Sequence, residues 1–404
     1  MNILSASFPD LRNVGFDRPL PTWLRLVLIL LCGLIPTVYV AKQYENRHDL
    51  TQLILFGQKE HPHALPEIRA LQPATDSPDG FDGQFYAQIA LDPSVQRPEF
   101  RTSVLCGSYR AQRVFLPALA YVIGHGSPPA ILRAYALLNL GFWYVLLAAL
   151  LCWVRGITAR GMLVIYAIVL STGALISIQR ALTDLPAATL GFLSIGLEDV
   201  PAALLISIAI LTKPTTGLFL TRYLSPFPDS IGASVRRGGI ILLALVLPAL
   251  WNVYIYHVLG NSNSGHNLTF PFRDWLGRIM ESWKDLATIP FDFQPWEITH
   301  WEWILFEFLA LSSMTLQAAF LLLRWQWSNP LWVMGIGFAL LFFCLSKENF
   351  VEQIAYTRTA FPITIAFNLL LLESKRGPLF FLYFIPGNIG LLVSLHEVIG
   401  FLIK

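Results

Sequence analysis

The segment Asp79-Gly80-Phe81-Asp82-Gly83-Gln84-Phe85-Tyr86 holds two carboxylates around a Gly-Phe pair, followed by a second glycine and two aromatic residues. Gly80 and Gly83 permit tight turns through which the backbone can approach a ligand. Aromatic rings can cover the C–H faces of a sugar while a carboxylate takes a hydroxyl, which makes Asp82 and Asp79 candidates for chemistry on a sugar. A turn with capping aspartates explains the same residues, because Asp and Gly are common in turns.

Cationic residues that suit a phosphate occur in two segments. Arg110 and Arg113 precede the apolar stretch Val114–Gly124, and arginine binds phosphate oxygens through a bidentate fork. Lys213 precedes Pro214 late in an apolar run, where an ionisable side chain costs roughly 2.5–3.5 kcal/mol on insertion scales. Each of these cations could neutralise a lipid phosphate, and snorkelling to the headgroups is the alternative for all of them.

Two further segments combine charge with the start of an apolar run. Asp184 begins such a run four residues after Arg180, either as a helix cap or as a functional carboxylate. Tyr356 and Arg358 precede a later run on the expected outer face, where arginine is uncommon. An anionic ligand is one reason for an arginine there, and a salt bridge to a nearby glutamate is another.

The elements that must position these residues are membrane helices. The chain has 404 residues, of which 55% are hydrophobic and 13% charged, whereas a soluble domain carries roughly 25% charged residues. The apolar residues form continuous runs close to the length that crosses a bilayer, about 20 residues. This excludes a soluble monomer and predicts an all-α fold, a polytopic transmembrane helical bundle.

We expect about ten spans, and Val114–Gly124 is too short to be one of them. It is expected to be interfacial or re-entrant, and Lys213-Pro214 is expected to interrupt the span that contains it. The predicted spans are Trp23–Ala41, Ile131–Val154, Met162–Ile178, Leu185–Leu197, Val200–Leu220, Gly239–Val258, Trp303–Leu323, Leu331–Leu345, Thr359–Leu372 and Leu379–Leu402.

The spans and the short-loop arginines, such as Arg155, Arg160, Arg236 and Arg237, set the predicted organisation. It comprises a cytoplasmic segment 1–22, a first transmembrane helix 23–41, a long external loop 42–129, transmembrane helices 130–258, a second external loop 259–301 and carboxy-terminal transmembrane helices 302–404. The net charge of +2 gives no indication of nucleic acid. The four cysteines show neither a disulfide framework nor a metal-binding pattern.

In their order along the chain, these motifs resemble those of GT-C-type integral membrane glycosyltransferases. The resemblance is to bacterial mannosyltransferase-like proteins related to PIG-V and the polyprenyl-phosphate-sugar-dependent transferases. The corresponding segments are Asp82–Tyr86, Tyr109–Pro117, Arg180–Pro186, Leu211–Gly217 and Tyr356–Arg358. The chain departs from the pattern at Lys213-Pro214, where Arg-Glu is expected, and after Asp184, where a second acidic residue is missing.

The resemblance implies transfer of a hexose, such as mannose, from a polyprenyl-phosphate donor to a glycan, lipid or protein acceptor. The site would lie on the periplasmic or external side of a bacterial inner membrane and use no cofactor. Asp82 would be the general base, with inversion at the sugar carbon and Asp79 as the second catalytic carboxylate. The pKa of Asp82 is expected to be raised by an apolar surface. The residues that would bind substrate are Arg110, Arg113, Arg180, Asp184, Lys213, Tyr356 and Arg358.

Other classes of function fit part of the pattern. A transporter or flippase of lipid-linked sugars also uses polar residues at membrane depth and broken helices. A catalytically inactive relative would keep the motifs while losing the reaction. A structural or assembly partner would need neither Lys213 at membrane depth nor an outward Arg358.

Overall fold

The structure, a computed structural model, describes residues 18–75, 77–154, 156–224, 230–260, 267–291, 299–350 and 353–403. Within these ranges the regular structure is helical, and β-pairing is limited to isolated bridges. The predicted all-α fold is confirmed. Arg155 and most of the predicted segment 1–22 lie outside the described residues.

Four helices in the described ranges are long and apolar enough to cross a membrane: α1 (Thr22–Arg47), α7 (Pro128–Trp153), α12 (Ile231–Leu259) and α14 (His300–Leu322). The pair α8 (Ala159–Val169) and α9 (Thr172–Gln179) makes a fifth if its 44° bend falls within one span. The shorter apolar helices are α10 (Asp184–Ile195), α11 (Asp199–Thr212), α15 (Pro330–Phe343), α18 (Phe361–Ser374) and α19 (Gly377–Gly387).

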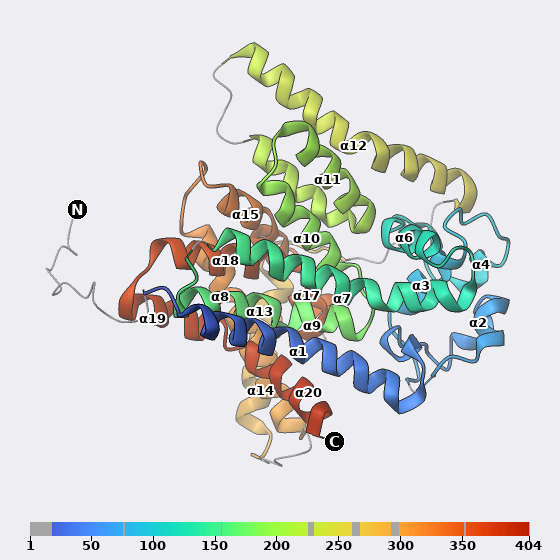
Figure 1. The fold of residues 1–404 in the computed structure, drawn as a ribbon, viewed down its shortest axis with the longest axis horizontal. Coiled ribbons are helices and arrows are strands. Elements are labelled where there is room, and N and C mark those ends of the chain that lie inside the picture. The colour runs from blue at the N-terminus through green and yellow to red at the C-terminus, as the bar shows by residue number, and fades with distance from the viewer. Residues whose placement is uncertain are drawn as a thin grey trace, which may run out of the picture.

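The long helices expose apolar side chains, as a helical membrane protein requires. Leu242 and Leu250 of α12 are 64% and 62% exposed, which suits contact with lipid rather than water. In Figure 1, α1 and α7 cross the middle of the molecule and α12 extends along its upper side. The pairing of α1 with α7 is held by Tyr144, whose hydroxyl donates to the Gly33 carbonyl at 3.0 Å.

The predicted external loop 42–129 folds into short helices. They are η2 (Leu50–Leu53), η3 (His61–His63), α2 (Pro66–Leu71), α3 (Gly83–Leu91), α4 (Phe100–Ser103), α5 (Gly107–Ala111) and α6 (Phe115–Ile123), where η marks a 3₁₀ helix. Every residue of α3 is buried, so this helix is the core of the segment. The nine residues of α6 cannot span a bilayer, as predicted for Val114–Gly124.

Besides the bent pair α8 and α9, two more predicted spans break inside the apolar sequence. The run 200–220 divides into α11 and the 3₁₀ helix η4 (Pro214–Leu224). The division occurs here because a proline disfavours helical geometry at the residue that precedes it. Lys213 accordingly takes an extended conformation between them. The run 379–402 divides into α19 and α20 (Leu391–Ile403), with Pro386 in the last turn of α19.

The predicted second external loop contains a helix of its own, α13 (Arg273–Thr288). Arg278 of α13 forms a salt bridge with the buried carboxylate of Glu307 in α14. The remaining short helices are α16 (Lys347–Phe350) and α17 (Gln353–Thr359), which connect α15 to α18. In this arrangement α17 packs against α9.

Candidate functional site

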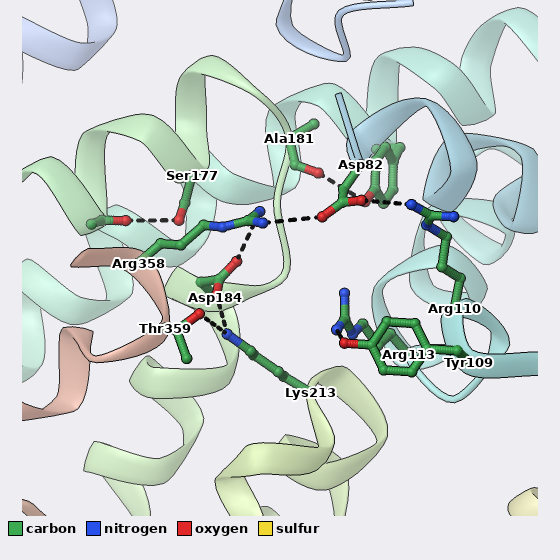
Figure 2. Close-up of polar contacts among 12 residues, drawn as sticks. Asp82, Tyr109, Arg110, Arg113, Ser177, Ala181, Asp184, Lys213, Arg358 and Thr359 are labelled. Carbon is green, nitrogen blue, oxygen red and sulfur yellow. Dashed lines mark hydrogen bonds and ion pairs between the residues drawn. The ribbon is translucent and has the colours of Figure 1, made fainter. Parts of the chain in front are cut away.

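A cavity of about 590 Å³ gathers charged side chains from segments far apart in the sequence. Its charged lining, within the described ranges, consists of Asp82, Arg110, Arg113, Asp184, Lys213 and Arg358. Two carboxylates therefore face four cations, which leaves an excess of two positive charges. We call this space the charged cavity, and Figure 2 shows its side chains directed toward one another.

The charges alternate in sign along a chain of contacts. Arg110 donates to one oxygen of the Asp82 carboxylate at 3.0 Å, and Arg358 donates to the other at 3.1 Å. Arg358 also lies 3.8 Å from the carboxylate of Asp184. Asp184 is in turn paired with Lys213, whose ammonium lies 3.3 Å from the hydroxyl of Thr359. Substitution of one residue in this series of ion pairs therefore removes a partner from the neighbouring residues.

Asp82 is held in place by close packing of the backbone around α3. It is the residue before the first turn of α3. A Cβ atom at Gly83 would lie 2.3 Å from the carbonyl oxygen of Arg180, and one at Gly80 would lie 2.4 Å from the backbone nitrogen of Gly57. These glycines were expected to approach a ligand, but they allow other backbone segments to approach instead. The contact at Gly83 brings Asp82 next to the turn that precedes Asp184.

That turn and the break before Pro214 present Asp184 and Lys213. Ala181 has a positive φ of 46°, and its carbonyl accepts a hydrogen bond from the buried Tyr135 hydroxyl at 2.9 Å. Asp184 then begins α10 with its side chain only 4% exposed. Lys213 follows α11 with its side chain 9% exposed. A buried charge needs a partner of opposite sign, which the pair supplies.

Arg358 comes from α17, which packs against α9 through a glycine. A Cβ atom at Gly173 would lie 2.7 Å from the carbonyl oxygen of Thr357 and 3.3 Å from the Cα of Arg358. Only glycine allows this approach. Gly173 was not identified from the sequence, because an apolar run with a glycine gives no indication of which helix packs against it.

The aromatic residues next to Asp82 cover arginines rather than a ligand. The Arg110 guanidinium lies 3.9 Å from the ring centroid of Phe85, which is 4% exposed. The Arg113 guanidinium lies over the rings of the buried Tyr86 and of Tyr109. Of these three rings, only that of Tyr109 lines the cavity, so the expectation that Phe85 and Tyr86 contact a sugar is wrong.

The protonation of Asp82 also differs from the expectation. Burial alone would raise the pKa of this carboxyl, but the positive charges of Arg358 and Arg110 outweigh it and hold the pKa well below its ordinary value. The raised pKa predicted for a catalytic base at Asp82 is therefore wrong. Burial raises the pKa of Tyr109, so its hydroxyl stays protonated at neutral pH.

A further part of the charged cavity's lining comes from the end of α15, from α16 and from the segment before α13. Their backbones are joined at Thr269, whose N–H donates to the Cys344 carbonyl at 2.8 Å, and at Ser346, which donates to Asn267 at 3.1 Å. The residues of this part of the lining are Asn267, Leu268, Leu341, Leu345 and Asn349. They were not predicted, since isolated leucines and asparagines carry no recognisable pattern.

Three residues predicted from the motifs lie outside the cavity lining. Asp79 is 74% exposed and pairs with Lys59 at 2.6 Å, because the turn at Gly80 directs it away from Asp82. Tyr356 is buried, and its hydroxyl donates to the Glu307 carbonyl at 3.3 Å. Arg180 contributes its backbone to the contact with Gly83, but its side chain is not part of the lining. All three residues are close in sequence to residues that line the cavity, but their side chains are not part of its lining.

In the part of the chain that the structure describes, no three His, Cys, Asp or Glu side chains come together as metal ligands. The described lining of the charged cavity offers guanidinium, ammonium and carboxylate groups, together with the hydroxyl and amide groups of Tyr109, Asn267 and Asn349. Compared with known proteins, the chain matches no family model, no curated protein and no solved structure.

Proposed function

We propose that the protein is a membrane glycosyltransferase of GT-C type that moves a hexose, such as mannose, from a polyprenyl-phosphate donor to an acceptor. The observation that carries this proposal is the charged cavity, where an excess of two cations surrounds Asp82. A phosphate is complementary to that excess. The Nε atoms of Arg110, Arg113 and Arg358 are buried and, among the described residues, have no hydrogen-bond partner.

The apolar wall of the cavity supports a lipid-linked donor. Leu268, Leu341 and Leu345 line the same cavity as the charged side chains. A donor with a phosphate between a sugar and an isoprenoid chain has both polar and apolar parts that such a lining accommodates. The cavity volume of about 590 Å³ is within the range of small-molecule sites, about 300–1,000 Å³.

In the proposed reaction, the acceptor hydroxyl oxygen attacks the sugar carbon while the bond from that carbon to the phosphate oxygen breaks. The hydroxyl proton passes to Asp82, and the phosphate leaves with its charge balanced by the arginines and Lys213. Asp82 becomes an effective base only after the phosphate has taken its arginine partners, because the paired carboxylate holds protons weakly. The site would then lie on the periplasmic side of a bacterial inner membrane, as the motif resemblance implies.

The same ion pairs favour a second candidate, a transporter or flippase of lipid-linked sugars. A carboxylate clamped by two arginines is a poor base, whereas a transporter only needs the cations to bind the phosphate. Proteoliposomes that contain the purified protein and a polyprenyl-phosphate hexose labelled in the sugar distinguish the two. A transferase moves label into an added acceptor fraction, and a flippase moves intact donor between leaflets without releasing polyprenyl phosphate.

Asp79→Asn is the matched control for Asp82→Asn in that assay, since Asp79 is three positions away and exposed. We expect Asp82→Asn to reduce label transfer by about 10²–10⁴-fold, the typical contribution of a general base. Asp79→Asn is expected to transfer normally. Full transfer by Asp82→Asn, or intact donor flipping without transfer, would reject the enzymatic proposal.

A further inference from the structure

A second cavity, of about 650 Å³, lies beside the first turns of α12. The last turns of α12 pack elsewhere, on α5, where Trp251 donates to the Ala111 carbonyl at 2.8 Å. The second cavity is mainly apolar, with walls from α12, α15 and the segment between α14 and α15. We call it the tryptophan cavity because Trp325, Trp327 and Trp332 line it. Its described lining shares no residue with the charged cavity.

The three tryptophans form one cluster that extends from the interior to the surface. Their ring centroids are 5.0 to 5.8 Å apart. Trp332 is 1% exposed and donates to the Leu321 carbonyl at 2.8 Å, while Trp325 is 74% exposed. Tryptophans at the ends of apolar helices mark the level where lipid headgroups meet acyl chains. The tryptophan cavity therefore opens at the depth where a lipid changes from polar to apolar.

The charge at this cavity selects for an anion. Arg237 is the charged residue within the described lining, and none of these lining residues is a carboxylate. A cation at the mouth of an apolar cavity complements a lipid that carries an anionic headgroup above an acyl chain.

We propose that the tryptophan cavity binds an acyl chain of an anionic membrane phospholipid, with the headgroup phosphate at Arg237. The apolar side chains Ile241, Ile336 and Leu340 contact the chain, and the tryptophans close its outer side. The phosphate of this lipid lies at the mouth formed by α12, so it is a different molecule from the donor proposed for the charged cavity. The inference goes beyond glycosyl transfer and stands if that proposal fails.

Two adjacent glycines provide a matched pair of variants. A Cβ atom at Gly238 or at Gly239 would meet open space, so both positions accept a large side chain without a clash. Gly238 lines the tryptophan cavity and Gly239 does not. Gly238→Trp therefore fills the cavity, and Gly239→Trp adds the same residue outside it. Arg237→Gln and its control Arg236→Gln separate the charge at the mouth from charge on the neighbouring surface.

The test is native mass spectrometry of the full chain in mild detergent, with phosphatidylglycerol or phosphatidylcholine added and thermal unfolding as the check on folding. We expect the protein to retain phosphatidylglycerol in preference to phosphatidylcholine. Arg237→Gln should weaken that retention about tenfold, the scale of losing one charge-assisted contact. Gly238→Trp should also weaken it, because the indole ring takes the space of the acyl chain. Gly239→Trp and Arg236→Gln should retain it.

Equal retention of the two lipids would overturn the proposal, as would unchanged phosphatidylglycerol retention by folded Gly238→Trp and Arg237→Gln. A third arm adds polyprenyl monophosphate. If Gly238→Trp weakens retention of that lipid and leaves phosphatidylglycerol unaffected, the cavity holds an isoprenoid tail and the phospholipid proposal is wrong.

Discussion

The guanidinium of Arg358 donates to the carboxylate of Asp82 at 3.1 Å although 276 positions separate them in the sequence. The same guanidinium lies 3.8 Å from Asp184, so it connects the segment around α3 to the beginning of α10 (Figure 2). This one side chain joins three parts of the charged cavity. Its position decides how both carboxylates are paired before any ligand binds.

Lys213→Ala is expected to weaken binding of a polyprenyl-phosphate hexose more than binding of an acceptor. The change removes one cation that could face the phosphate, an effect of roughly 1.5–3 kcal/mol or about 10- to 100-fold in affinity. Lys59→Ala is the control, because Lys59 is 69% exposed and pairs with Asp79 outside the cavity. Donor affinity is measured by titration in detergent. An unchanged affinity in Lys213→Ala would refute this role.

Gly173→Val is expected to displace Arg358, since a Cβ atom at this position would lie 2.7 Å from the Thr357 carbonyl oxygen. Backbone cannot yield as a flexible side chain does, so α17 must shift from α9. We predict a lower thermal midpoint and loss of donor binding. Gly141→Val in α7 serves for comparison, because a Cβ atom there meets nothing within 4 Å. Equal behaviour of the two variants would show that the close approach at Gly173 does not position Arg358.

Tyr109→Phe should affect donor binding, whereas Tyr356→Phe should affect thermal stability. The Tyr109 hydroxyl accepts from Arg113 at 2.7 Å and its ring lines the charged cavity, so its removal should raise the KM for donor. Tyr356 is buried away from the lining, so its removal should lower thermal stability by about 0.5–1.5 kcal/mol and leave KM unchanged. A KM effect confined to Tyr356→Phe would place the binding site elsewhere.

The lowered pKa of Asp82 predicts a specific dependence of stability on pH. The ionised carboxylate stabilises the folded protein above its ordinary pKa of about 3.9, and this contribution is lost as the pH falls through the lowered pKa of the folded state. Asp82→Asn should therefore unfold at a lower temperature than the unmodified protein at pH 7. The difference should shrink in strong acid. A difference that is constant from pH 7 to strong acid would contradict the ion pairing.

The sequence predicted an all-helical fold with long apolar helices, because apolar runs and the lack of charge determine such helices locally. The prediction of about ten spans is not confirmed, since four or five spans in the described residues are long and apolar enough to cross a membrane. The sequence also identified Asp82, Arg110, Arg113, Asp184, Lys213 and Arg358, which all line one cavity. Asp79 and Tyr356 were predicted from the same motifs but point elsewhere, since the turn at Gly80 and the packing of α17 decide direction. Residues of one motif are close together along the chain, but their side chains can point in different directions.

The pairing of Asp82 was beyond the reach of the sequence for a related reason. Whether a carboxyl near a membrane has a raised or a lowered pKa depends on which charges lie within a few ångströms of it. Those charges come from α5 and α17, and the close approach of α17 to α9 depends on Gly173. No local pattern gives the distance between such segments.

Equilibrium binding can be compared between a polyprenyl-phosphate hexose and the uncharged polyprenol of the same length. We predict that the phosphate-bearing lipid binds far more tightly than the polyprenol, and that Arg358→Gln removes most of this preference. Arg236→Gln, whose guanidinium pairs with Asp199 outside the charged cavity, should keep it. Equal affinity for the two lipids, or an undiminished preference in Arg358→Gln, would contradict a phosphate site in the charged cavity.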